Sequence, residues 1–412
     1  MLPHGSADRH VRILGHIVST PSLLVAHAAL RGALFPIPII TLFWKDEIGM
    51  SFTAIMVLQA IFSATVVLLE FPSGYVADRI GYRASLLIGG AFWTVGWVVY
   101  SVGTTFAAMA AAEVLLGIGM SFTSGADSAL LFVSVAVGNR RTTYLAWESR
   151  VRAAMQTSEA VSAAVGGVLY AFAPRLPFWL MVPTAIAALA TAFGTHEPRS
   201  LQVGERLSHF RHAVGIVHTS LRRHPRLRAT MTLSVILGLS SFFLVWFIQP
   251  YMQAHGVPTA WFGPIWAAIH LWLAAISLAS ARIAAALGVN WTLFGCCWLI
   301  LLGYGGLAIG ESMPSFLFYL CLLTVRGLQG PLLVRALQDD APPEDRASVL
   351  SLNTLLFRIA FTIFGPLVGW LVEQAGMPAA LAGLGIVLTA AALAAWGAFR
   401  RAHQRPETRR TA

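Results

Sequence analysis

The sequence predicts an all-α polytopic membrane protein with twelve transmembrane helices in two pseudo-symmetric six-helix bundles. Three observations lead to this prediction: the composition, the lengths of the apolar stretches, and the positions of the arginines between them. Of 412 residues, 57% are hydrophobic and 11% are charged, whereas roughly 25% of the residues in a typical soluble domain are charged. So few polar side chains cannot cover a surface that faces water, but a bilayer favours apolar side chains on its proteins.

Twelve stretches of the chain are long and apolar enough to cross a hydrocarbon core, which is about 30 Å thick and needs roughly 20 helical residues. The fourth stretch is longer than necessary, so it is either one helix or a helix followed by an interfacial segment. The first is too long for the core of a signal peptide, and we expect it to be retained. The stretches are 17–43, 52–72, 84–103, 105–136, 147–172, 176–194, 229–250, 260–285, 290–310, 313–335, 347–372 and 377–399.

The basic residues lie almost entirely in alternate loops. All but one of the 28 basic residues are Arg; only Lys45 and Arg175 fall in the predicted outside loops, and Arg31, Arg326 and Arg358 fall within spans. The positive-inside rule therefore places both termini in the cytoplasm, and we expect a multi-pass protein of the cell inner membrane. Because the remaining arginines are spread over several short segments, the net charge of +10 does not indicate a nucleic-acid-binding surface.

The longest polar segment, 195–228, divides the chain into predicted domains at 1–194 and 229–412. Within this segment apolar residues recur at spacings of three and four, which is typical of an amphipathic helix on the cytoplasmic membrane surface. The helix would be a tether between the two halves or, alternatively, a regulatory site. Its apolar residues are Leu207, Phe210, Val214, Val217 and Leu221.

Missing motifs exclude several functional classes. A phosphate-binding G-x-x-x-x-G-K-[ST] loop needs a Lys, and the single Lys45 lies in W-K-D-E, so no ATP-driven motor of that kind is expected. The catalytic patterns H-E-x-x-H, G-x-S-x-G and S-x-x-K do not occur, and we expect neither an enzyme nor a cofactor or metal site.

The two halves of the sequence are weakly similar to each other, as expected for a duplicated six-helix unit. Glu113–Gly117 in the fourth span corresponds to Arg326–Gly330 in the tenth, and Ser162–Gly167 in the fifth corresponds to Gly365–Trp370 in the eleventh. Small residues and proline at matching helix positions suggest hinges. The candidate helix hinges are Gly166, Gly167, Gly365 and Pro366.

The loop after the second span carries the sharpest local pattern, Glu70-Phe-Pro-Ser-Gly74-Tyr-Val-Ala-Asp78-Arg79-Ile-Gly81-Tyr-Arg83. Gly74 would allow close approach of a neighbouring helix, and Asp78 would cap the positive N-terminal end of an adjacent helix. Gly81 would permit a tight turn, while Arg79 and Arg83 would hold the loop at the cytoplasmic face.

This loop resembles the signature of the major facilitator superfamily, G-x-x-x-D-[RK]-x-G followed by basic residues. Tyr82 stands where the family has a basic residue, and Arg83 keeps the second one. The lead-in from Glu70 and the stretch Ser124-Gly-Ala-Asp127-Ser-Ala-Leu are similar to one bacterial exporter-like branch. The resemblance implies two bundles that rock about a central cavity, with a cytoplasmic gate at this loop that includes Glu70 and Asp127.

The resemblance favours export without fixing the direction of transport. Antiporters of the family often carry G-P-x-x-G-G in helix five, where this chain has Ser162-Ala163 followed by Gly166-Gly167. The Gly-Pro pair occurs instead in the eleventh span, as Gly365-Pro366.

Seven ionisable residues are predicted within the spans, where each unpaired charge costs roughly 3 kcal/mol. Together they would exceed the stability of an ordinary domain, so most should be paired, hydrated or protonated. They are Arg31, Glu70, Glu113, Asp127, Glu159, Arg326 and Arg358.

The resemblance places helices one, four, seven and ten, and with them Arg31, Glu113 and Arg326, around the central cavity. We expect Glu113 to pair with Arg31 and to take up a proton when substrate leaves, with His27 on the same helical face as a relay. The alternative is a static bridge that fixes helix packing. The other candidates, either helix–helix hydrogen bonds or substrate contacts, are Glu159, His270 and Arg358.

The leading hypothesis is a monomeric, proton-coupled exporter of small amphiphilic or toxic compounds that works by alternating access. The first alternative is an uptake carrier or uniporter for a small anionic metabolite, suggested by the embedded arginines. The second is a receptor or scaffold that transports nothing.

Overall fold

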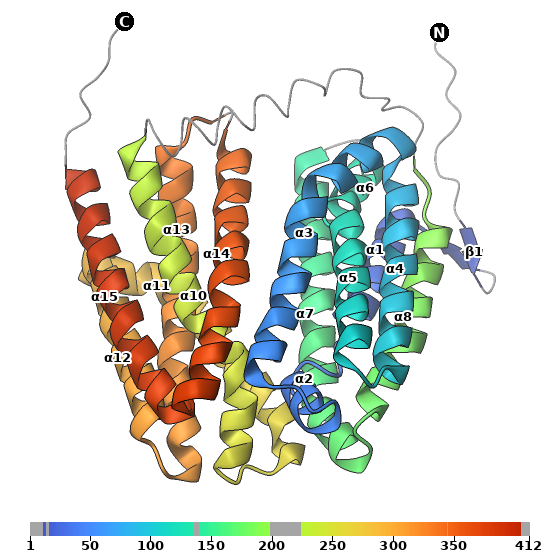
Figure 1. Ribbon diagram of the computed structural model, residues 1–412. Coiled ribbons are helices and arrows are strands. Elements are labelled where there is room, and N and C mark those ends of the chain that lie inside the picture. Colours follow the sequence, from blue (N-terminus) through green and yellow to red (C-terminus); the bar gives the residue numbers. More distant parts are fainter. Residues whose placement is uncertain (1–10, 14–15, 136–139, 198–223, 344, 405–412) are drawn as a thin grey trace, which may run out of the picture. The chain divides into compact units, whose positions relative to one another are not determined.

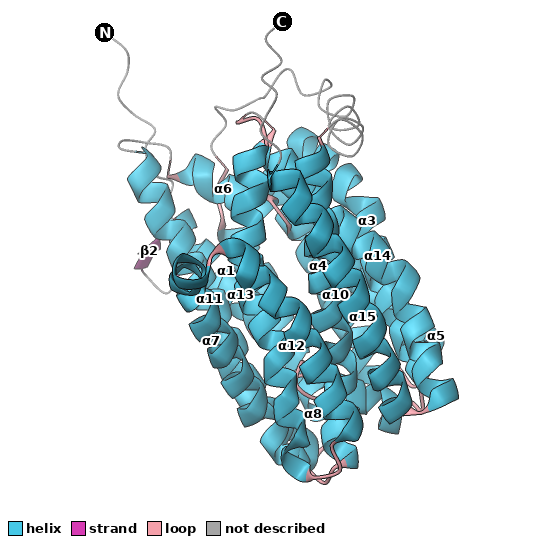
Figure 2. Cartoon of the chain, turned by 90° about the vertical axis from the view of Figure 1, so that its left-hand side faces the viewer, coloured by secondary structure: helices cyan, strands magenta, loops and turns pink. Residues whose placement is uncertain are grey.

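The computed structural model describes residues 11–13, 16–135, 140–197, 224–343 and 345–404 (Figure 1). The predicted amphipathic helix with Leu207, Phe210, Val214, Val217 and Leu221 lies outside these residues. Over the described residues the chain is almost entirely helical (Figure 2), which confirms the all-α prediction.

The first half of the chain begins with two short antiparallel strands and continues as helices. The elements are β1 (Val11–Ile13), β2 (His16–Val18), α1 (Thr20–Gly32), α2 (Ile40–Leu42), the π-helical turn Phe43–Glu47, α3 (Phe52–Ile80), α4 (Tyr82–Val102), α5 (Phe106–Thr123), α6 (Ala126–Ser134), α7 (Arg140–Phe172) and α8 (Leu176–Gly194).

The second half is built from long helices and two short 3₁₀ turns. The elements are α10 (Pro225–Ala254), the turn Thr259–Trp261, α11 (Phe262–Leu287), α12 (Val289–Ile309), the turn Met313–Phe318, α13 (Tyr319–Asp340), α14 (Arg346–Ala375) and α15 (Met377–Gln404).

The chain forms two compact units. The first contains 1–49, 61–204 and 259–267, and the second contains 50–60, 205–258 and 268–412, so α3 and α11 each divide between the two. In the first unit α4 packs against α5 and α8, and α1 packs against α7 and α8. In the second unit α12 packs against α13 and α15, and α10 packs against α13, α14 and α15.

Ten helical segments among the described residues are long and apolar enough to cross a membrane. The predicted fifth span is α7, a continuous helix in which Gln156–Glu159 lowers the apolar content. With α7 and the first stretch added, the structure is consistent with twelve spans. The overlong fourth span breaks at Gly125, whose φ of 82° separates α5 from α6.

The prediction of one continuous first span over 17–43 is wrong. Helix α1 ends at Gly32, and the chain then turns until α2 begins at Ile40. Pro36 and Pro38 explain the break, because proline has no amide hydrogen and disfavours the helical conformation of the residue before it. At 1.5 Å per residue the 13-residue helix α1 is by itself too short to cross the hydrocarbon core, so the first span also needs the segment that continues to Glu47.

Two glycines on α7 allow close packing, one of them against the broken first span. A Cβ on Gly166 would overlap the carbonyl oxygen of Phe35, and one on Gly167 would lie 2.6 Å from the carbonyl oxygen of Thr259. Helix α7 continues without interruption through both glycines, and α14 continues through Gly365 and Pro366. Gly166 and Gly167 therefore serve close packing in this structure, and their role as hinges stays a prediction.

The turn between α3 and α4 is made by Gly81, as predicted. Its φ is 98°, in the region that favours glycine. The carboxylate of Glu197 accepts hydrogen bonds from the amides of Tyr82 (3.1 Å) and Arg83 (3.0 Å) and so caps the N-terminus of α4. The Arg83 guanidinium donates to the carbonyl oxygen of Phe193 at the end of α8 (2.8 Å). Glu197, which the sequence analysis did not single out, thus joins this loop to the end of α8.

Other residues of this motif lie in the last turns of α3, on its surface. Glu70, Asp78 and Arg79 are exposed, and the Arg79 guanidinium lies over the ring of Tyr75 at 4.9 Å. A Cβ built on Gly74 would meet open space, and the close approach of a neighbouring helix at this glycine stays a prediction.

Gly81→Ala should destabilise the protein by about 1–3 kcal/mol, because alanine strains this backbone and its Cβ would lie 2.7 Å from the capping oxygen of Glu197. Gly74→Ala is the matched control, since Gly74 lies near the end of α3 with open space around it. Thermal unfolding of the two purified variants checks this. Equal melting temperatures would contradict the assigned role of Gly81.

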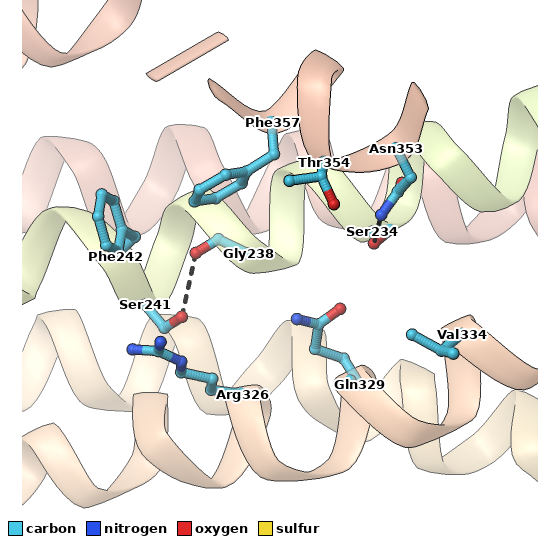
Figure 3. A pocket seen from close by; sticks show the side chains of 11 residues that line it. Ser234, Gly238, Ser241, Phe242, Arg326, Gln329, Val334, Asn353, Thr354 and Phe357 are labelled. Carbon is cyan, nitrogen blue, oxygen red and sulfur yellow. Dashed lines mark hydrogen bonds between the residues drawn. The ribbon is translucent and has the colours of Figure 1, made fainter. Parts of the chain in front are cut away.

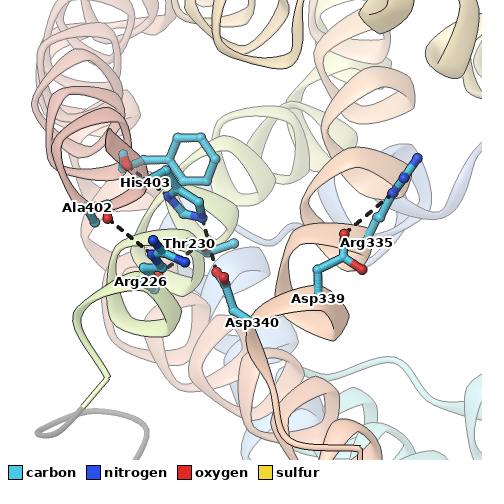
Figure 4. A network of polar contacts seen from close by, with 8 residues as sticks. Arg226, Thr230, Arg335, Asp339, Asp340, Ala402 and His403 are labelled. Carbon is cyan, nitrogen blue, oxygen red and sulfur yellow. Dashed lines mark hydrogen bonds and ion pairs between the residues drawn. The ribbon is translucent and has the colours of Figure 1, made fainter. Parts of the chain in front are cut away.

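A polar network ties together three helix ends of the second unit (Figure 4). His403 near the end of α15 contacts the Asp340 carboxylate at the end of α13 (3.1 Å). Arg226 at the start of α10 donates to the carbonyl oxygen of Ala402 (3.3 Å). Arg335 and Asp339 form an exposed pair on α13 at 3.6 Å. The first two contacts join the first turn of α10 to the end of α15 and the end of α15 to the end of α13.

Candidate functional site

The second unit contains a cavity of about 260 Å³ between α10, α13 and α14 (Figure 3). Each helix contributes residues three or four positions apart, so one face of each helix lines the space. The lining residues are Ser234, Gly238, Ser241 and Phe242 of α10, Arg326, Gln329, Gly330 and Val334 of α13, and Asn353, Thr354 and Phe357 of α14.

The cavity combines an aromatic wall with polar groups. The rings of Phe242 and Phe357 meet edge to face at 5.4 Å. Figure 3 shows Arg326 and Gln329 projecting from α13 toward the other two helices. The Asn353 amide donates to the Ser234 hydroxyl (3.2 Å), and its own oxygen is buried without a hydrogen-bond partner in the described structure. The Gln329 amide oxygen is also buried without a hydrogen-bond partner among the described residues. The cavity therefore offers apolar contact, hydrogen-bond acceptors and one guanidinium to a small solute.

A separate cluster of buried polar groups lies in the first unit, around α1. His27 is buried, and its Nδ1 contacts the carbonyl oxygen of Ala188 (3.0 Å) and the hydroxyl of Thr191 (3.1 Å), both on α8. One turn further along α1, the Arg31 guanidinium lies over the Trp93 ring of α4 at 4.9 Å. His27 Nε2 and Arg31 Nε are buried without a hydrogen-bond partner among the described residues.

Asp127 of α6 is the carboxylate whose charge acts on Arg31. Its Oδ1 accepts the amide of Ser128 at 2.7 Å, at the N-terminus of α6. The charge of Glu148 on α7 also acts on Asp127. Glu148 forms an ion pair with Arg152 at 3.0 Å. The Tyr144 hydroxyl donates a hydrogen bond to the Glu148 carboxylate (3.3 Å). Asp127, predicted as part of a gate, therefore belongs to the charge cluster around Arg31.

The predicted pair between Glu113 and Arg31 is not formed. Glu113 is buried on α5 and accepts a hydrogen bond from the Tyr100 hydroxyl of α4. Trp93 and Tyr100 are seven positions apart on α4, which at 1.5 Å per residue separates them by about 10 Å along the helix. Trp97 lies between them, with ring centroids 5.8 Å from Trp93 and 5.4 Å from Tyr100. Glu113 and Arg31 therefore contact opposite ends of a row of three aromatic rings.

The remaining predicted residues lie at separate places. Arg326 lines the cavity of the second unit, Arg358 is half-buried on α14, His270 is half-buried on α11, and Glu159 is half-buried on α7. The described residues contain no group of three or more His, Cys, Asp or Glu side chains arranged to hold a metal ion.

Sequence reasoning did not find the polar and aromatic residues that surround Arg326. They are Ser234, Ser241, Phe242, Gln329, Asn353 and Phe357. Uncharged side chains are common in membrane helices, so only the packing of α10, α13 and α14 distinguishes these from their neighbours. One sequence feature could have indicated the cavity: the spacing of Arg326 and Gln329 puts both on one face of α13.

Comparison with known proteins agrees with a bundle of membrane-spanning helices. The family model for the Major Facilitator Superfamily matches residues 23–360. The chain belongs to this superfamily of membrane transporters.

One curated relative is Multidrug resistance protein 1 of Bacillus subtilis (strain 168), which is 26% identical over 154 residues. That match covers 37% of this chain and 39% of the relative, so the chain spans well under half of the length of that protein.

Solved structures share the fold at low sequence identity. The nucleoside transporter NupG has a TM-score of 0.75 and 12% identity, with 94% of this chain and 98% of that chain covered. A POT family transporter in complex with a thioalcohol conjugated peptide has a TM-score of 0.71 and 14% identity, with 95% and 98% covered. A bacterial homologue of the human lysosomal transporter Spinster has a TM-score of 0.68 and 13% identity, with 92% and 93% covered.

Proposed function

We propose that this protein is a secondary active transporter that exports small amphiphilic organic compounds in exchange for protons. The cavity of the second unit carries the proposal, because it joins an aromatic wall to a set of polar groups and so fits a solute with both characters. Its volume of about 260 Å³ suits a small solute, since pockets for drug-sized ligands hold about 300–1,000 Å³. The similarity to a multidrug resistance protein favours export.

The protein acts as a monomer in the cell inner membrane, with both termini in the cytoplasm. The distribution of arginine along the chain supports this orientation. Energy comes from an ion gradient, because the chain has no phosphate-binding Lys loop for ATP.

Asp127 is the proton carrier in this proposal, in place of Glu113. A buried Arg31 is costly in a membrane, and an ionised Asp127 nearby offsets that cost. When Asp127 takes up a proton, Arg31 loses this compensation, so the conformation that shields Arg31 becomes less favourable. His27 on α1 acts on Arg31, and Glu148 on α7 acts on Asp127. Glu148 is itself paired with Arg152 and accepts a hydrogen bond from Tyr144.

A specific observation favours a second function, uptake of a small anionic metabolite. Arg326 is the one charged residue that lines the cavity of the second unit. A guanidinium attracts carboxylates and phosphates and repels cations.

An accumulation assay in bacteria separates these functions. Expression of the native protein should lower the cell content of fluorescent amphiphiles, and a protonophore should restore it. Phe357→Ala should lose this effect because it removes half of the aromatic wall, whereas Phe364→Ala, an exposed residue of the same helix outside the cavity, should keep it. Increased accumulation of anionic solutes would instead support uptake. No change with any compound would contradict a transport function.

A further inference from the structure

The charge of the cavity in the second unit has one sign. No Asp or Glu is among its lining residues, and Arg326 carries its only full charge. Arg326 makes no hydrogen bond or ion pair with another described residue. The acidic residues further along α13, Asp339 and Asp340, are 13 and 14 positions away, or about 20 Å along the helix. An approaching solute therefore meets a guanidinium with no carboxylate among the described residues that line the cavity.

Two other groups that line the cavity have the opposite hydrogen-bonding need. Asn353 uses its amide nitrogen on the Ser234 hydroxyl, and its oxygen remains buried without a donor. The oxygen of Gln329 is buried without a donor as well. Burying such acceptors without a partner is unfavourable, so a solute that brings a hydroxyl or amine N–H gains affinity here.

The aromatic wall faces the side chains of α13. Phe242 contacts Phe357 at 5.4 Å and Phe361 at 4.8 Å, both in edge-to-face geometry. Figure 3 places Phe242 and Phe357 across the cavity from Arg326 and Gln329. A flat ring can pack against such a wall while its substituents reach the groups on α13 and α14.

We infer that this cavity selects small planar organic anions, of the aromatic carboxylate class, that carry a hydrogen-bond donor opposite the acid group. This inference rests on the proposed function, because it takes the cavity as the solute site. Arg326 would hold the carboxylate in charge-assisted hydrogen bonds, the two phenylalanines would contact the ring, and the oxygens of Gln329 and Asn353 would accept from the donor.

Titration calorimetry on the purified full-length protein tests the inference with four matched probes. We expect 4-hydroxybenzoate to bind best and benzoate, which lacks the donor, to bind about tenfold more weakly. Neutral 4-hydroxybenzamide should also bind more weakly, and the cation of 4-hydroxybenzylamine should not bind. Arg326→Gln should weaken 4-hydroxybenzoate binding by about ten- to a hundredfold. Arg335→Gln removes the same charge from an exposed position on the same helix outside the cavity and should change nothing.

Two further variants keep the test decisive if Arg326→Gln folds poorly. Asn353→Leu should abolish the preference for 4-hydroxybenzoate over benzoate, and Arg326→Glu should shift the preference to 4-hydroxybenzylamine. Stronger binding of the cation by the native protein, or no binding of any probe, would overturn the inference. Efflux of other amphiphiles in the accumulation assay would then leave the transport function standing. If the protein binds these anions through Arg326 but moves no solute, the proposed transport function is contradicted and the inferred ligand class is kept.

Discussion

Asp127→Asn should abolish proton-driven transport and leave solute binding to the cavity of the second unit unchanged. The amide has nearly the shape of the carboxylate and can still accept the amide hydrogen of Ser128, but it cannot take up a proton. It also removes the negative charge that acts on Arg31. A coupling free energy of about 1–3 kcal/mol between proton and solute would disappear, so accumulation against a gradient should fall by about five- to a hundredfold.

Two assays on reconstituted vesicles separate coupling from movement. Accumulation driven by a pH gradient should be lost in Asp127→Asn, whereas exchange of labelled for unlabelled solute at equal pH should remain. Asp339→Asn, the same change at an exposed position of α13, should retain both activities. Glu113→Gln should also retain coupling, because Glu113 contacts Tyr100 and not Arg31. If Glu113→Gln loses coupling and Asp127→Asn keeps it, the proton carrier has been assigned to the wrong carboxylate.

Gly166→Ala should prevent the first unit from packing normally. The added Cβ would overlap the Phe35 carbonyl oxygen and lie 3.0 Å from Pro38. Backbone atoms cannot rotate away as a flexible side chain does, and overpacking costs about 1–3 kcal/mol or more. The clash falls on the segment that replaces the second half of the first span, so the yield of monodisperse protein and its melting temperature should both drop.

Gly295→Ala on α12 is the matched control. The new Cβ would meet open space there. Alanine is favoured over glycine in helices by about 1 kcal/mol, so this variant should be as stable as the native protein or more stable. Size-exclusion profiles and thermal unfolding compare the two. A Gly166→Ala variant as stable as Gly295→Ala would show that the Phe35 segment does not pack against α7 as described.

The sequence predicted features that depend on local chemistry. Apolar length located most of the spanning helices, and the glycine at position 81 marked a turn that only a positive φ permits. A break in the fourth span, one of the two alternatives for that stretch, is found at Gly125, where the backbone again has a positive φ. These features can be predicted because hydrophobic length and glycine conformation act within a few residues of each other.

Features that depend on which helix faces which were not predictable. Glu113 was assigned to Arg31 because both are buried charges at similar depth, but Trp93, Trp97 and Tyr100 on one face of α4 separate them. Pro36 and Pro38 were visible in the sequence, yet the apolar residues around them concealed the helix break. The neutral side chains around Arg326 gave no signal until three helices were packed together.

Proton movement driven by a solute tests proton-coupled export most directly. Vesicles that contain the native protein, a pH-sensitive dye and a transported amphiphile are diluted into solute-free buffer at the same pH. Exit of the solute should acidify the interior of these vesicles, and vesicles with Asp127→Asn or without protein should show no such change. Solute exit through the native protein with no change in internal pH would contradict proton exchange as the driving step.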